Sequence, residues 1–144
     1  MAKDFHALIR LYQYRVDEKR RALGVLLGNV ARLEQERDRH ERQILEEQKI
    51  AAEAPEGVGQ YYGNFARAAV QRRGLIAAAI ADVEKQIAVA QEEVREEFRD
   101  FKSMSLAQES RDAEEAAELA RFEQRFLDEL GQESHRRKRA RAAG

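Results

Sequence analysis

The chain has 144 residues, of which 37% are charged and only 7% aromatic, and its formal net charge is -1. This length allows one domain, but so few aromatic residues argue against an ordinary globular core. A nearly balanced charge predicts neither a nucleic-acid-binding protein nor a polyacidic tail, so any argument from charge has to be local. The absence of cysteine excludes disulfides, thiolate zinc sites and cysteine nucleophiles, and it fits a reduced, cytosolic setting.

No segment approaches the roughly 18 uninterrupted apolar residues that a membrane span needs, and the N-terminus lacks the apolar stretch of a signal peptide. We therefore expect a soluble chain. Its dominant residues are Ala, Glu, Arg, Leu and Gln, all of them strong helix formers.

The first predicted helix covers about residues 5–53 and carries a seven-residue repeat. Steps of four and three select 14 positions, of which ten are apolar. A narrow apolar stripe surrounded by charge is typical of a coiled-coil seam. The seam positions are Phe5, Ile9, Tyr12, Val16, Lys19, Leu23, Leu26, Val30, Leu33, Arg37, His40, Ile44, Glu47 and Ala51.

A concentrated turn signal follows the first helix. The only proline, Pro55, and three of the eight glycines lie between Ala54 and Gly63, which predicts a hairpin turn at about 54–61. An aromatic group stands beside this turn: Tyr61, Tyr62 and Phe65. Aromatic residues at this place either cap the exposed end of the seam or contact a partner.

The second predicted helix covers about residues 62–135 and repeats the seam, with 11 of 13 positions apolar. These positions are Tyr62, Ala66, Ala69, Arg73, Ile76, Ile80, Val83, Ile87, Ala90, Val94, Glu97, Phe101 and Met104. Beyond them the same register meets the polar residues Gln108, Arg111, Glu115 and Glu118. An apolar stripe restarts one residue later, as Ala116, Leu119, Phe126 and Leu130, flanked by Phe122 and Leu127. A phase slip of this kind rotates the stripe around the helix.

Two helices joined by a short turn are expected to form an antiparallel coiled-coil hairpin, so the predicted fold is all-α. The second helix is the longer, and Phe5 should lie opposite about Glu109, with roughly 40 Å of helix projecting beyond the first. His40 with Arg37 interrupts the first seam, and in this register His40 falls near Arg73, Gly74 and Ala77. We interpret this as a polar layer that fixes the register, and a pH sensor is the alternative.

Large apolar side chains on the projecting part have no intramolecular partner and predict a docking segment. The alternatives are that this end packs on another copy or bends back as a third helix. Residues 109–133 hold nine acidic and three basic residues, whereas a basic tail at 136–144 holds five basic and no acidic residues. Such a tail attracts acidic protein surfaces and nucleic acid alike.

No catalytic, cofactor or metal site is predicted, and we do not expect an enzyme or a small-molecule substrate. The three histidines are far apart, the carboxylates are spread over solvated faces, and no phosphate-binding loop appears. Gly24 and Gly28 form a GxxxG pattern, in which we expect Gly24 to relieve crowding.

Both ends of the chain carry recognisable residues. Phe5, Leu8, Leu11 and Arg15 open a long helix, a glycine-containing turn and an aromatic follow, and the segment RFEQRFLDELGQESHRR lies near the end. In these features the chain resembles the FliJ family of flagellar export proteins. The residues that match the pattern of the family in the C-terminal segment are Arg121, Glu123, Gln124, Leu127, Asp128, Glu129, Arg136 and Arg137.

The resemblance implies a stalk-like component of the flagellar type III export apparatus, cytoplasmic and peripheral at the inner membrane. Its implied partners are the export ATPase ring, the cytoplasmic domain of the export gate and substrate chaperones. The C-terminal and N-terminal ends would enter the ring, and the end with Tyr61, Tyr62 and Phe65 would face the gate. The partner-binding candidates near the C-terminus are Leu119, Arg121, Phe122, Glu123, Gln124, Phe126, Leu127, Leu130, Arg136 and Arg137. Two alternatives are the equivalent stalk of a virulence secretion system and a coiled-coil scaffold whose basic tail binds nucleic acid.

Overall fold

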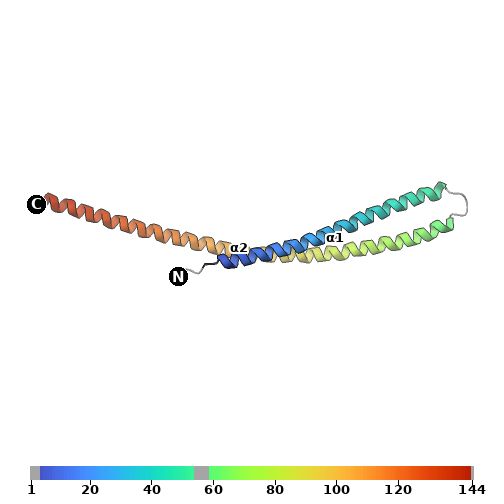
Figure 1. Cartoon of the computed structure of the whole chain (residues 1–144), viewed down its shortest axis with the longest axis horizontal. Helices are drawn as coiled ribbons and strands as arrows, with labels where there is room; N and C mark the ends of the chain where they lie inside the picture. Colours follow the sequence, from blue (N-terminus) through green and yellow to red (C-terminus); the bar gives the residue numbers. More distant parts are fainter. Residues whose placement is uncertain (1–3, 54–58, 144) are drawn as a thin grey trace. The chain divides into compact units, whose positions relative to one another are not determined.

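The computed structural model describes residues 4–53 and 59–143, and almost all of them belong to two α-helices. Helix α1 comprises His6–Glu53 and helix α2 comprises Gly59–Ala143, with 48 and 85 residues (Figure 1). The predicted all-α fold with a longer second helix is confirmed. Most of the predicted turn, residues 54–58, lies outside the described residues.

The ends of the helices follow from local chemistry. The Asp4 carboxylate accepts a hydrogen bond of 2.9 Å from the backbone N–H of His6, which satisfies one of the free donors at the start of α1. Helix α1 ends at Glu53, two residues before Pro55, a residue that cannot continue a helix. Helix α2 runs on through residues 136–143, beyond the expected end at about 135. The basic side chains of residues 136–141 stabilise this end of the helix, because their positive charges interact favourably with the negative end of the helix dipole.

The contacts divide the chain into two compact units, one of Tyr12–Arg99 and one of Met1–Leu11 with Asp100–Gly144. In the first unit α1 lies beside the green and yellow part of α2 (Figure 1). Ion pairs across the two helices run antiparallel, because Lys19 pairs with Glu93 at 3.0 Å while Glu41, later in α1, pairs with Arg73 at 2.7 Å.

The predicted seam is the core of the helix pair. Of all the predicted seam positions up to Met104, only Arg37 and Arg73 are exposed. The buried apolar residues are Val16, Ala69, Ile76, Ile80 and Ala90. Because each helix has a single neighbour in this unit, the stability of the pair depends on this one stripe.

Several glycines lie inside the helices without a packing reason. A Cβ atom at Gly24, Gly28, Gly63 or Gly74 would meet no atom within 4 Å. The expectation that Gly24 relieves crowding is therefore wrong, because the space beside it is open. Each such glycine leaves the unfolded chain more flexible than alanine would and weakens the helix.

Replacing Gly74 by alanine is expected to stabilise the helix pair by about 0.5–1 kcal/mol, because the methyl group enters open space and removes backbone entropy from the unfolded chain. Thermal unfolding followed by far-ultraviolet circular dichroism should show a higher Tm. The matched control is Ala77→Gly at an exposed position of the same helix, which should lower Tm by a similar amount. An unchanged or lower Tm for Gly74→Ala would contradict the reading of this glycine as dispensable.

Candidate protein-binding surfaces

The last part of α2 is uncovered. Every residue from Asp112 to Ala143 is exposed, and we call this segment the overhang. It carries five large apolar side chains whose exposed fractions lie between 51% and 62%: Leu119, Phe122, Phe126, Leu127 and Leu130. At about 100° per residue they share one face of the helix, and we call them the apolar stripe.

Charged and amide side chains border the apolar stripe. Phe122, Arg125, Phe126 and Glu129 line a hollow of about 310 Å³. The Gln124 amide donates a hydrogen bond of 3.1 Å to Asp128, one turn later. The remaining partner-binding candidates of the overhang are exposed as well: Arg121, Glu123, Arg136 and Arg137. The structure therefore brings the C-terminal candidates together on one free helix.

Phe5, in the N-terminal segment of residues 4–11, contacts α2 immediately before the overhang. The backbone N–H of Phe5 donates a 2.8 Å hydrogen bond to the side-chain oxygen of Gln108, and the Arg111 guanidinium lies 4.5 Å from the centre of the Phe5 ring. Phe5 was expected opposite about Glu109, and this register is confirmed. The polar partners were missed, although the spacing from Met104 puts Gln108 and Arg111 on the seam.

The aromatic cluster at the start of α2 divides into two roles. The rings of Tyr62 and Phe65 lie 6.4 Å apart, are partly buried, and line a small hollow together with Ile44 of α1. Tyr61 is 66% exposed. Tyr62 and Phe65 therefore cover the end of the seam, while the Tyr61 side chain is exposed and accessible to a partner.

His40 forms a polar layer inside the seam. Its Nε2 atom lies 2.9 Å from the carbonyl oxygen of Ala69, so this nitrogen carries the proton and donates. Its other ring nitrogen, Nδ1, is buried without a hydrogen-bond partner. The contact lies one turn before Arg73, Gly74 and Ala77, which the sequence register set opposite His40.

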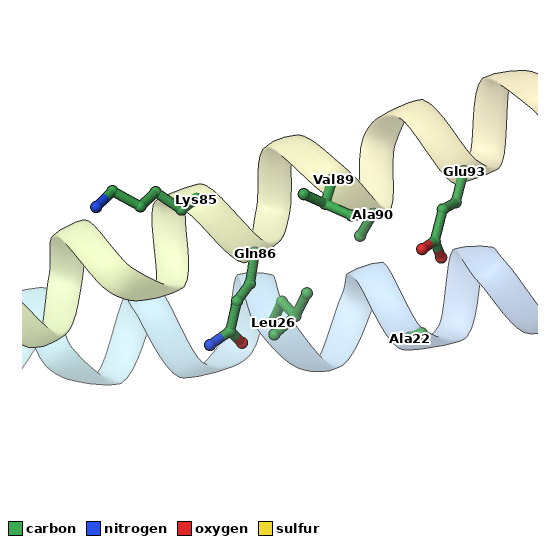
Figure 2. A pocket seen from close by; sticks show the side chains of 7 residues that line it. All are labelled: Ala22, Leu26, Lys85, Gln86, Val89, Ala90 and Glu93. Atoms are coloured by element: carbon green, nitrogen blue, oxygen red, sulfur yellow. The ribbon is translucent and has the colours of Figure 1, made fainter.

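A shallow apolar groove of about 380 Å³ lies between the helices of the first unit (Figure 2). Figure 2 shows Leu26 of α1 close to Gln86 of α2, with Val89 and Ala90 one turn further along. Near one end of the groove the Glu93 carboxylate accepts a hydrogen bond from Lys19, and this contact raises the pKa of the Lys19 ammonium. The stabilisation from the raised pKa of Lys19 is therefore complete at neutral pH and is lost as the pH rises through that pKa.

Within residues 4–53 and 59–143, no helix is long and apolar enough to cross a membrane. No group of three or more His, Asp or Glu side chains in these ranges is arranged to hold a metal ion.

Replacing Gln108 by alanine is expected to loosen the N-terminal segment, because the Phe5 amide loses its acceptor. A hydrogen bond contributes about 1 kcal/mol net, so the amides of the first turn of α1 should exchange with solvent roughly fivefold faster. Hydrogen exchange read by mass spectrometry measures this directly. The exposed neighbour substitution Glu109→Ala should leave the rates unchanged, and equal rates in Gln108→Ala would disprove the fastening role.

One of three comparisons with known proteins agrees with the resemblance seen in the residues. A search of curated proteins found no match, and neither did a search of solved structures. The family model described as "Flagellar FliJ protein" matches residues 1–140, nearly the whole chain. Its description is that of a flagellar protein, which favours the flagellar apparatus over a virulence secretion system. The chain therefore belongs to the FliJ family and is a component of the flagellar export apparatus.

Proposed function

We propose that this chain is a non-enzymatic, stalk-like coiled coil that links the export ATPase ring with the cytoplasmic domain of the export gate and assists the cycling of substrate chaperones. Membership of the FliJ family supplies the setting. The observation that carries the proposal is the apolar stripe of the overhang, which remains uncovered in the isolated chain.

The apolar stripe is suited to docking in the ring. Five large side chains would each gain about 1.5–3 kcal/mol on full burial, which is ample for a specific protein contact even after the entropy cost of association. The charges that border them would tune the rate and specificity of the contact more than its strength. The N-terminal segment lies next to the overhang at Gln108 and Arg111, so both ends of the chain would enter the same partner.

The start of α2 is the corresponding contact for the gate. Tyr61 presents an exposed aromatic ring, while Tyr62 and Phe65 are partly used in the seam. A tyrosine that is free in the isolated chain offers a large apolar face and a hydroxyl group, a combination that is enriched at interfaces. The two proposed contacts thus belong to the two ends of α2.

This arrangement gives the coiled coil a mechanical role. The paired helices have a continuous seam between two surfaces that would engage different assemblies, so a displacement at one end is passed to the other through regular helix. The chain would then reside in the cytoplasm and reach the inner membrane only through its partners. Contacts dominated by a helix face and peripheral charge would allow repeated release.

The overhang is tested by replacing Leu119, Phe126 and Leu130 together by serine. Binding to the purified export ATPase should weaken by at least about a hundredfold, since three buried side chains are lost from the contact. The Tm should change little, because these residues pack on nothing within the chain. Isothermal titration calorimetry and thermal unfolding measure the two quantities.

The matched control is Ala117→Ser, at an exposed position on the opposite face of the same helix, which should bind normally. If the triple variant bound the ATPase as tightly as the parent chain, the docking assignment would be wrong. A large loss of Tm would instead make these side chains part of a core.

The gate contact is tested by Tyr61→Ser. Binding to the purified gate domain should fall about tenfold or more, while Tm stays the same, because Tyr61 is exposed. Phe65→Ser is the contrasting variant and should lower Tm, because its ring packs in the seam. Normal gate binding by Tyr61→Ser would remove this residue from the interface.

A further inference from the structure

The overhang has a property that its docking role does not require, namely that its charge is segregated along its length. Before the apolar stripe, residues 109–118 carry five acidic side chains and one basic one, and after it, residues 135–144 carry five basic side chains and no acidic ones. The structure makes both parts one continuous helix up to Ala143. Acidic and basic segments therefore lie on either side of the apolar stripe.

The segregated charges share a face with the apolar stripe. At about 100° per residue, Asp112 and Glu115 before it and Arg137 and Arg141 after it all lie within roughly 60° of its midline. These four residues are exposed. Arg137 makes an ion pair of 3.5 Å with Glu133 on its own helix, and its side chain remains 74% exposed.

We propose that this face is self-complementary and that the overhangs of two copies of the chain bind each other antiparallel. A parallel pair would align acidic with acidic and basic with basic segments, which is strongly unfavourable. The antiparallel pair aligns each acidic segment with the basic segment of the other copy. A two-fold axis then repeats every contact, as in most homodimers.

The apolar residues select the register of the pair. When Leu119 of one copy faces Leu130 of the other, Phe122 faces Leu127 and Asp112 faces Arg137. Every one of these contacts occurs twice. The paired stretch, residues 112–137, begins one residue after Arg111, where the contact of α2 with Phe5 ends.

The dimer goes beyond the proposed function and does not depend on it. The apolar stripe would be covered by a second copy while the export apparatus is absent, and a partner would have to displace that copy in order to dock. The tests below use the chain alone, so their failure would leave the docking proposal untouched.

Cysteine cross-linking tests the geometry, and it is clean because the chain has no cysteine of its own. Leu119→Cys and Leu130→Cys are made as separate chains, one with a mass tag, and oxidised alone and as a mixture. We expect the mixture to form a disulfide-linked dimer of unequal chains, and each variant alone to remain unlinked. Ala117→Cys, on the opposite face of the helix, is the matched control and should not link.

Two outcomes of this experiment would overturn the proposal. Efficient linking of Leu119→Cys to itself would mean that the pair is parallel. Absence of linking in the mixture, with the parent chain monomeric in sedimentation equilibrium at submillimolar concentration, would mean that the overhangs do not associate.

Charge exchange tests the electrostatic part. The variant Arg137→Glu and the variant Asp112→Lys should each self-associate about tenfold or more weakly, because residues 112 and 137, which face each other twice in the pair, then carry like charges. An equimolar mixture of the two should recover the affinity, since acidic ends again face basic ones. Circular dichroism confirms that each variant keeps its helices. Weakened variants that show no recovery in the mixture would contradict the proposed charge pairing.

Discussion

The apolar seam residues of each helix have to be removed from water, and the rest of the structure depends on this constraint. Along Tyr12–Arg99 the seams of the two helices cover each other, and the buried residues are small or branched side chains such as Val16, Ala69 and Ile80. No large core lies behind this seam, because each helix has one neighbour. On α2 the apolar pattern continues in Leu119, Phe122, Phe126, Leu127 and Leu130, which are exposed, and we propose that these residues bind another protein.

Polar residues in the seam give the pairing its register. His40 donates to the carbonyl of Ala69, and Gln108 accepts from the amide of Phe5, so each of these hydrogen bonds forms only when the two partners are correctly aligned. The buried Nδ1 of His40 and one Arg111 nitrogen make no hydrogen bond. These groups lower the stability of the seam, and a shifted register would leave still more polar atoms unpaired.

Much of this architecture follows from the sequence, because the heptad period is a strong signal over many turns. The seam, the longer second helix and the pairing of Phe5 with the region of Glu109 could all be predicted. The polar contacts could not be predicted, because Gln108 and Arg111 interrupt the apolar pattern of α2. Only the structure shows that Phe5 lies beside them. The helices keep the predicted register next to His40, since the neighbouring Glu41 pairs with Arg73. The acceptor of the His40 ring nonetheless lies four residues before Arg73, at Ala69, because the reach of the side chain adds to the register of the backbones.

The end of α2 was harder to predict for a different reason. Gly131 and Ser134 have low helix propensities, but the surrounding residues are strong helix formers and outweigh this cost. The helix therefore continues through the basic segment. The open space beside Gly24 could not be foreseen, because a spacing of glycines does not reveal what lies next to them. Which residues of the overhang bind a partner depends on the surface of that partner, and no property of this chain alone determines it.

Residues 112–143 of α2 are exposed, and we propose that their apolar face binds another protein. The most direct test is amide hydrogen exchange of the dilute chain, alone and bound to the export ATPase. We expect slow exchange at seam residues such as Ile80 in both states, and fast exchange over residues 112–143 that becomes slow only in the complex. Exchange over residues 112–143 as slow as in the seam in the dilute, isolated chain would contradict this proposal.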